Sequence, residues 1–433
     1  MFKKLPQLIA NSETISRIGK IENVVGMSVE ASGGRSSIGD IVMIYNEEQN
    51  RQIRAEVVGF KENRIQLMAY ENTGGISAGS FVRNTRRRLK VPVGDFLRGR
   101  IINAMGEPMD GGPGFNPTRF YSVDSPGINP LARPPIRERL EFGVKAIDGL
   151  NTIGKGQRIG IFAGSGVGKS TLMGMIAKNV KTDINVIALV GERGREVREF
   201  IEKDLGPEGI KRSVLVVATS DQPAMLRMKC PLVATTIAEY FKDQGKDVLL
   251  MMDSLTRFAM AQREIGLATG EPPVARGYTP SIYAEFPKLL ERSGKFEKGS
   301  ITGIYTVLVE GDDTNEPIAD TVRGILDGHI VLSRKLANEN HFPAIDIGAS
   351  ISRLMVNIVP EEHQKLAAKM RDLLSVYTKN EDLISIGAYK AGTNPRLDTA
   401  VGKIDAINDY LMQRIADSYS IEEDLAAMRK ILN

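Results

Sequence analysis

The pattern of hydrophobic and polar positions divides the chain into regions of different period. Between residues 19 and 70, apolar and polar side chains alternate in short runs that turn residues separate: Ile41–Tyr45, Gln52–Phe60 and Arg64–Tyr70. A period of two is typical of half-buried strands, and short strands at this spacing predict a small β-barrel. We therefore expect an N-terminal barrel domain over residues 19–90.

The middle of the chain contains continuous apolar runs instead. These runs are Arg158–Phe162, Ile184–Val190, Val214–Ala218, Val248–Met252, Ile301–Val309 and Ile330–Leu332. Continuous hydrophobicity predicts strands that are buried on both faces, and the segments between them have the alternating rhythm of strand and helix. We expect an α/β domain over residues 91–356, built on a mostly parallel sheet with helices on both faces.

Beyond Asn357 the strand pattern ends and apolar positions recur with helical spacing. The candidate helices are His363–Tyr377, Leu397–Ala416 and Ile421–Leu432. Amphipathic segments in succession predict a helical C-terminal domain over residues 357–433. A loop between them, Gly387–Asp398, carries Lys390 and Arg396, and we expect these side chains to present a basic surface to an acidic partner.

Two further segments stand outside these regions. Residues 1–18 place Phe2, Leu5, Leu8 and Ile9 at near-helical spacing, which predicts a partner-binding amphipathic helix or, alternatively, a frayed terminus. The basic run Arg83–Lys90 is interpreted as a solvated linker, with binding to acidic lipid or nucleic acid as the alternative.

Length, charge, cysteine content and the length of the apolar runs add to this picture. A chain of 433 residues is too long for one core, so several domains are expected. A net charge of +4 argues against a dedicated nucleic-acid binder. Cys230 is the only cysteine, which excludes an intramolecular disulfide and suits a reducing cytoplasm, and the sequence contains no apolar run long enough to span a bilayer. We expect a cytoplasmic protein that docks on a membrane-embedded partner.

The most informative local sequence follows the run Arg158–Phe162. A glycine-rich loop there opens a helix, which is how backbone N–H groups converge on phosphate oxygens; the expected binding residues are Gly164, Ser165, Gly166, Val167, Gly168, Lys169, Ser170 and Thr171. Lys169 can reach the β- and γ-phosphates, and the Ser170 hydroxyl can ligate Mg²⁺. Ala163 stands where the strict P-loop pattern has glycine, and we expect this only to relax the turn.

Two carboxylates follow other apolar runs. We expect the strand Ile184–Val190 to lie beside the P-loop strand, so that Glu192 arrives near the γ-phosphate position and can polarise a water molecule, while Arg193 pairs with phosphate oxygens. Asp253 ends the run Val248–Met252 and can support Mg²⁺ through water.

At this point several strings resemble the catalytic subunits of the F-type, V-type and type III export ATPases, and most closely the flagellar export branch. The most specific string is Pro343–Ser352, and the others are Gly191–Val197, Ala268–Pro273, Gly277–Ser281 and Glu291–Gly294. The resemblance covers nearly the whole chain. It implies a RecA-like P-loop core and a homohexamer that hydrolyses ATP with Mg²⁺.

The resemblance also implies roles for individual residues. Lys169 and Ser170 would hold Mg-ATP, Arg193 and Arg257 would contact phosphate, and Arg353 would be the arginine finger supplied to the neighbouring subunit. Rotary β subunits of the resembling family carry an adenine-stacking tyrosine just after the corresponding histidine. This chain departs from that pattern, because Gln364 follows His363.

The implied partners are a stator-like regulatory protein at the N-terminus, a central stalk-like protein and export chaperones at the C-terminal domain, and a membrane-embedded export gate. The alternatives are a rotary F- or V-type subunit, an injectisome ATPase, a hexameric RNA translocase, and a regulatory subunit without catalysis. Non-catalytic members of the family have Gln at the position of Glu192, which argues against a regulatory subunit. The expected barrel offers few aromatic residues for stacking on RNA, so we expect no nucleic acid partner.

Overall fold

The computed structural model describes residues 18–433 except 47–49, 126, 128 and 310–315. The expected N-terminal amphipathic helix therefore lies outside the described residues. No helix in the described part of the chain is long and apolar enough to cross a membrane.

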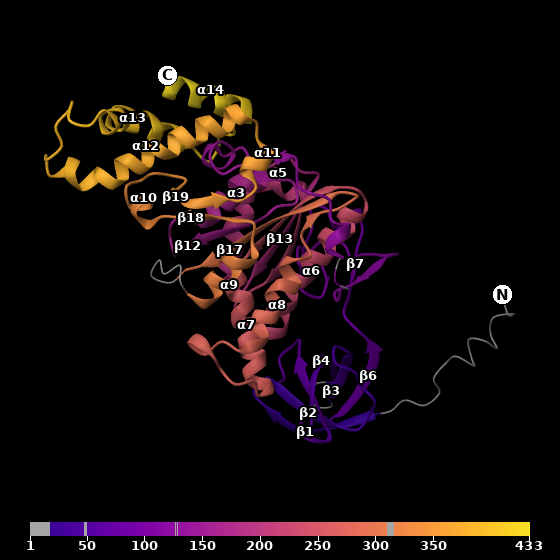
Figure 1. The fold of residues 1–433 in the computed structure, drawn as a ribbon. Coiled ribbons are helices and arrows are strands. Elements are labelled where there is room, and N and C mark those ends of the chain that lie inside the picture. Colours follow the sequence, from indigo (N-terminus) through magenta and orange to yellow (C-terminus); the bar gives the residue numbers. More distant parts are fainter. Residues whose placement is uncertain (1–17, 47–49, 126, 128, 310–315) are drawn as a thin grey trace.

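The N-terminal region is a closed barrel with strand order β1-β2-β5-β4-β3-β6 (Figure 1). Its strands are β1 (Ile18–Val25), β2 (Ser28–Ser32), β3 (Ile41–Asn46), β4 (Arg51–Lys61), β5 (Arg64–Ala69) and β6 (Phe81–Arg87). Alternate side chains such as Val29, Ile53 and Leu67 fill its interior, so the period-two prediction is confirmed.

The basic run Arg83–Lys90 is not a linker. Its first part belongs to β6, which pairs with β1 on one side and with β3 on the other and so closes the barrel. The expectation was wrong because Arg side chains on the outer face of a strand leave the backbone free to complete the ladder.

A nine-stranded sheet forms the centre of the molecule, in the order β19-β18-β12-β17-β15-β13-β14-β8, with β16 paired to β17. The strands are β8 (Ile101–Asn103), β12 (Arg158–Ala163), β13 (Ile184–Val190), β14 (Ser213–Ala218), β15 (Asp247–Asp253), β16 (Gly294–Lys295), β17 (Ser300–Leu308), β18 (Gly328–Leu332) and β19 (Ile345–Ser352). All pairs are parallel except β18–β19 and β16–β17. The expected fold class is confirmed.

The order of the strands corrects one expectation. β13, which precedes Glu192, does not lie beside the P-loop strand β12, because β17 and β15 lie between them. The carboxyl ends of parallel strands still share one edge, so the consequence for Glu192 survives. The string Pro343–Ser352 also proves to contain a strand, β19, which the apolar pattern did not predict.

Helices cover both faces of this sheet (Figure 1). On one face, α3 (Lys169–Asn179) packs in a core with Ile187 and Leu189 of β13. The opposite face packs Val186 and Ala188 against a second set of helices: α6 (Ala224–Asp243), α7 (Leu255–Thr269), α8 (Pro280–Leu290) and α9 (Pro317–Ile325). Alternate residues of one buried strand thus serve two cores, which explains its uninterrupted hydrophobicity.

Shorter elements connect these layers. The helical ones are η2 (Asp95–Leu97), η3 (Pro130–Ala132), α2 (Lys145–Asp148), α4 (Gly194–Glu199), η4 (Phe200–Leu205), α5 (Gly206–Lys211), η5 (Ala275–Gly277), α10 (Arg334–Asn338) and α11 (Met355–Ile358). Two small sheets pair β7 (Lys90–Pro92) with β9 (Phe120–Ser122) and β10 (Arg139–Leu140) with β11 (Ile153–Gly154).

The C-terminal region is helical, as predicted, and consists of α12 (Glu361–Ser385), α13 (Pro395–Leu411) and α14 (Ile421–Leu432). Asn394 caps α13, and Ser420 with Glu423 forms a capping box on α14. Met370, Ile407 and Met428 pack these helices into the same core as α3. The helices therefore rest on the sheet at its β18–β19 side (Figure 1).

Candidate active site

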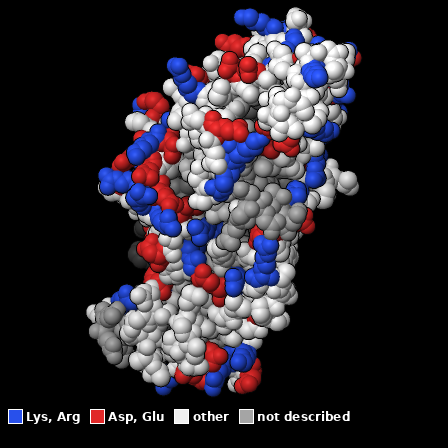
Figure 2. Space-filling view, turned by 90° about the vertical axis from the view of Figure 1, so that its left-hand side faces the viewer, with Lys and Arg blue, Asp and Glu red and all other residues white. Residues whose placement is uncertain are grey.

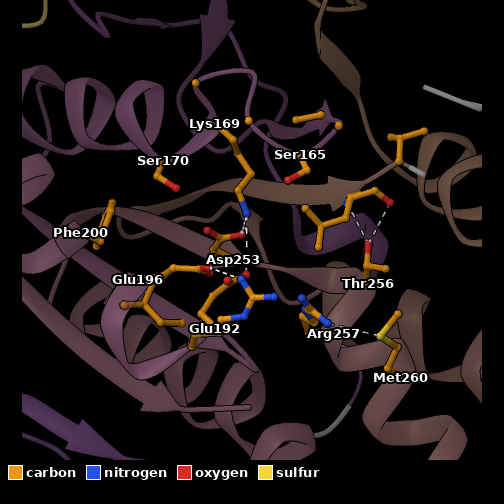
Figure 3. Close-up of a pocket in the computed structure, with 18 of the residues that line it drawn as sticks. Ser165, Lys169, Ser170, Glu192, Glu196, Phe200, Asp253, Thr256, Arg257 and Met260 are labelled. Carbon is orange, nitrogen blue, oxygen red and sulfur yellow. Dashed lines mark hydrogen bonds and ion pairs between the residues drawn. The ribbon is translucent and has the colours of Figure 1, made fainter. Parts of the chain in front are cut away.

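A cleft of about 780 Å³ opens at the carboxyl edge of the central sheet. The P-loop, the residues after β13, the end of β15 and the first turns of α7 line it (Figure 3). Parallel strands bring these segments, which are far apart in the sequence, to one edge.

The P-loop has the geometry of an anion site. Gly166 and Gly168 have φ of 78° and 88°, in the left-handed region that favours glycine. Gly168 is the N-cap of α3, and no side chain caps this helix. The first N–H groups of α3 are therefore available to phosphate oxygens. Ala163 is the last, buried residue of β12 and pairs with Leu308, so this position precedes the turn rather than forming it.

Lys169 lies between two carboxylates. Its Nζ forms an ion pair with Asp253 Oδ1 and lies 3.8 Å from Glu192 Oε1 (Figure 3). Thr306 Oγ1 also donates to Asp253 Oδ1 at 2.7 Å. Burial alone would lower the pKa of Lys169, but the two carboxylates outweigh it and raise the pKa above its ordinary value.

The Oε1 of Glu192 is buried and has no hydrogen-bond partner among the described residues; the same holds for Oε2 of Glu316, which also lines the cleft. Burial raises the pKa of Glu192 to about 7, and the neighbouring charge of Asp253 acts in the same direction. A carboxyl group whose pKa lies near neutrality is suited to accept a proton from water.

The arginines of the expected site fall into two groups. Arg257 lines the cleft from α7, with Nε buried and without a partner. It packs against Gly191, whose φ is 66° and where a β-carbon would lie 3.1 Å from Arg257 Cβ. Arg193 lies at the cleft mouth, is largely exposed and pairs with Glu196 at 3.0 Å.

Arg353 lies elsewhere. It follows β19, is exposed and does not line the cleft of its own chain. Its backbone N–H donates to Asp327 O at 3.0 Å, and its Nη2 lies 3.4 Å from Arg323 O. Two exposed apolar side chains, Ile351 and Val356, stand near it in the chain. Val167 of the P-loop does not line the cleft either, because its side chain is buried in the core beneath the loop. The fold brings the other expected site residues together in the cleft.

The side chain of Gln364 is turned away from the cleft, since Nε2 donates to Val356 O and Val359 O at 2.9 and 3.1 Å. Phe342 places an aromatic ring near the P-loop, since a β-carbon on Gly168 would lie 3.4 Å from its Cε1. The aromatic side chains of Phe200 and Tyr278 line the cleft itself. Phe342 is 40% exposed. Phe342 directly precedes the family-specific string Pro343–Ser352, and the sequence analysis did not select it.

The sequence analysis also missed residues that line the cleft. Arg334 donates to Ser165 O at 3.1 Å and so supports the P-loop from α10. Thr256 Oγ1 accepts from Leu308 N at 2.9 Å and ties α7 to β17. Glu196 lies beside Glu192 in the cleft and was visible in the string Gly191–Val197, but its spacing alone gave no reason to select it.

A glycine loop at the end of a parallel strand, with a lysine between two carboxylates, defines a P-loop nucleotide-binding ATPase core. Comparison with known families agrees. Residues 143–352 match the nucleotide-binding domain of the ATP synthase alpha/beta family, and residues 21–86 match its beta-barrel domain. Residues 359–430 match the T3SS EscN ATPase C-terminal domain.

Individual relatives are similar over nearly the full length. The chain is 55% identical to the flagellum-specific ATP synthase of Bacillus subtilis, covering 99% of this chain and 98% of the relative. It is 48% identical to the type 3 secretion system ATPase of Xanthomonas euvesicatoria, covering 96% and 94%. The solved structure of assembled EscN from enteropathogenic E. coli superposes with a TM-score of 0.91 at 47% identity, covering 96% of this chain and 100% of that one.

The chain therefore belongs to the ATP synthase alpha/beta family, in the branch of the flagellum-specific and type III secretion ATPases. It is an ATPase of that branch.

Proposed function

We propose that this protein is the ATP-hydrolysing motor of a bacterial flagellar type III export apparatus, acting as a ring of six identical subunits that drives chaperone release and substrate unfolding. The observation that carries the proposal is the cleft in which Lys169, Glu192 and Asp253 meet at a P-loop, in a chain 55% identical to a flagellum-specific relative.

The comparisons bear on two alternatives, a rotary subunit and an injectisome ATPase. The match of residues 359–430 to a type III C-terminal domain favours an export ATPase over a rotary subunit. An injectisome ATPase remains the second candidate, because a type 3 secretion relative is 48% identical. On the face drawn in Figure 2, Lys and Arg are interspersed with Asp and Glu.

The proposed mechanism uses the residues of the cleft in turn. The N–H groups of Gly164–Thr171 and the Lys169 ammonium bind the phosphates, while Arg257 and Arg193 contact phosphate oxygens from the opposite side. Glu192 accepts a proton from water as the water oxygen bonds to the γ-phosphorus and the bond to the bridging oxygen breaks, which yields ADP and phosphate.

The donor set also fits Mg²⁺. The Ser170 hydroxyl and the Asp253 carboxylate share the cleft, and both are oxygen ligands of the kind Mg²⁺ prefers. The described residues contain no cluster of three His, Cys, Asp or Glu that could hold a metal by itself, so the remaining ligands would be phosphate oxygens and water. When bound, the ion would neutralise phosphate charge.

Arg353 would complete the site of the neighbouring subunit. Its exposure outside its own cleft supports an action across an interface. A finger of this kind stabilises the charge of the transition state and contributes roughly 10³–10⁵ in rate where it has been measured.

The partners and the location follow from the same proposal. EscN has been solved with its central stalk EscO, with a TM-score of 0.89 to this chain. We propose a central stalk-like protein and export chaperones at α12–α14, a stator-like protein at residues 1–18, and a cytoplasmic ring at the inner face of the membrane near the export gate.

The function is tested by Glu192→Gln. The amide keeps the shape of the side chain but cannot accept the proton, so we expect phosphate release to fall by about 100-fold or more while a fluorescent ATP analogue still binds. Glu199→Gln is the matched control, because Glu199 lies on α4 outside the cleft and should leave turnover unchanged. Turnover of Glu192→Gln near that of the control would remove Glu192 from catalysis.

A further inference from the structure

The strand that leads to Arg353, β19, is interrupted by a large bulge. His329 of β18 pairs with Ile351 and Val331 pairs with Asp346, so residues 347–350 of β19 oppose Ile330 alone. A bulge leaves backbone groups of the ladder without their usual partners. It also re-aims the residues that follow it.

Neighbouring side chains replace part of the lost ladder. Asp346 Oδ1 accepts from Ala349 N at 2.9 Å, and Ser350 Oγ accepts from Val331 N at 2.9 Å. His329 Nε2 lies 3.0 Å from Ala349 O. These contacts leave the carbonyl oxygens of Ile347 and Ser350 to be satisfied from elsewhere.

Arg371 supplies those bonds from the C-terminal helix α12. Its Nη1 donates to Ile347 O at 2.6 Å and to Ser350 O at 3.3 Å. Its Nη2 donates to Leu150 O at 2.7 Å and to Asn151 Oδ1 at 2.6 Å. One planar guanidinium therefore binds the bulge and the segment before β11 at the same time.

That second segment also holds the residue next to Arg353. Ser352 Oγ donates to Thr152 O at 2.7 Å and accepts from Gln157 Nε2 at 3.0 Å. Arg371 thus fixes the strand before Arg353 twice, directly at the bulge and indirectly through residues 150–152.

We propose that Arg371 is a positioning residue for Arg353, which couples the placement of α12 to the reach of Arg353 toward the neighbouring subunit. The inference rests on the proposed function, because it takes Arg353 to act across a subunit interface. A change in the position of the C-terminal helices, where partners are proposed to bind, would then alter hydrolysis in the adjacent site without contact to ATP.

Two variants test the positioning role in steady-state hydrolysis. Arg371→Met removes all four bonds, and we expect kcat to fall about 10-fold or more with KM for ATP changed less than about twofold, because the nucleotide-binding cleft is untouched. Arg371→Lys keeps the charge but not the fork, and should be intermediate. Lys369→Met is the matched control, since Lys369 on the same helix donates to Leu432 O and not to the bulge.

Mixing subunits separates positioning from folding. The Glu192→Gln subunit has an inactive cleft but a correctly placed Arg353, whereas the Arg371→Met subunit has an active cleft but a displaced Arg353. In mixed rings, some interfaces place Arg353 of a Glu192→Gln subunit at the cleft of an Arg371→Met subunit. We therefore expect activity above that of either variant alone. If Arg371→Met does not fold, the same mixture is made with Arg371→Lys.

A mixture of Arg353→Ala with Glu192→Gln separates the action of Arg353 across the interface from the positioning role of Arg371. Rescue in this pair without rescue in the Arg371 pair would overturn the positioning role alone. Failure of both pairs would overturn the action of Arg353 across the interface and the role of Arg371 with it. A loss of kcat in Lys369→Met equal to that in Arg371→Met would show that Arg371 serves only to hold the helices in place.

Discussion

Outside the cleft, Asp424 is a buried carboxylic acid whose pKa the fold shifts strongly. It lies in α14, is 1% exposed, and neither carboxylate oxygen has a hydrogen-bond partner. Burial raises the pKa of Asp424 to about 7, although the charge of Lys145 acts against it. Lys145 lies over the rings of Tyr410 and Tyr419, with its Nζ 5.4 and 4.8 Å from their centroids.

The raised pKa predicts a pH-dependent stability. The folded chain holds the proton of Asp424 more tightly than the unfolded chain, so the free energy of unfolding falls as pH rises from about 4 to about 7 and is level above that. A difference of about three pH units corresponds to at most about 4 kcal/mol. Asp424→Asn removes this dependence.

We expect Asp424→Asn to gain thermal stability relative to the native chain at pH 8 and to lose that advantage toward pH 5, as measured by scanning calorimetry. Glu422→Gln on the same helix is the control, because its side chain is exposed and its surface ion pair with Arg139 should contribute little to stability. A constant difference between Asp424→Asn and the native chain at all pH values would contradict the argument.

The tip of the α12–α13 hairpin is the element most suited to a partner. Leu383 and Ile386 are exposed there, and the sequence led us to expect a basic surface from Lys390 and Arg396. Arg396, however, pairs with Asp372 of α12. Within the described chain, Lys390 forms no ion pair and is exposed. The basic character of this tip therefore rests on Lys390.

Lys390→Glu should leave basal hydrolysis unchanged but weaken stimulation by the purified central stalk-like protein of the same export system. The effect should be several-fold at low salt and smaller at high salt, because exposed charges act mainly on encounter and are screened. Lys365→Glu, at the exposed start of α12, is the control. Equal stimulation of both variants at both salt concentrations would show that the tip is not the coupling surface.

At the scale of the whole molecule, one chain carries an active-site cleft and an arginine that cannot serve it. Arg353 is exposed, and so are Ile351 and Val356, which are near it in the sequence and are 46% and 63% exposed. Exposed apolar side chains close in sequence to an exposed arginine suit contact with a second copy, and a ring of identical copies would supply every cleft with an arginine.

Specific activity should therefore rise more than linearly with protein concentration as rings form, and Arg353→Ala should bind ATP while hydrolysing it at a rate lower by roughly 10³. Light scattering measured alongside phosphate release relates activity to assembly. A specific activity that stays flat down to monomeric concentrations would reject the action of Arg353 on a neighbouring site.

The local sequence by itself determined the class of fold and most of the cleft. Buried parallel strands need continuous apolar residues, so β13 and β15 could be predicted almost to the residue, and Glu192 and Asp253 follow directly from where those strands end. The P-loop is equally local, because its glycines and the start of α3 form a single segment.

Only the tertiary structure decided the rest. The order of strands in the sheet depends on which helices cover which face, so the two strands between β12 and β13 could not be predicted from their own residues. The ring of Phe342 reaches Gly168, and Arg371 reaches the bulge of β19, from segments far apart in the chain. Periodicity records which side of an element is buried, whereas these contacts depend on how the elements are placed against one another.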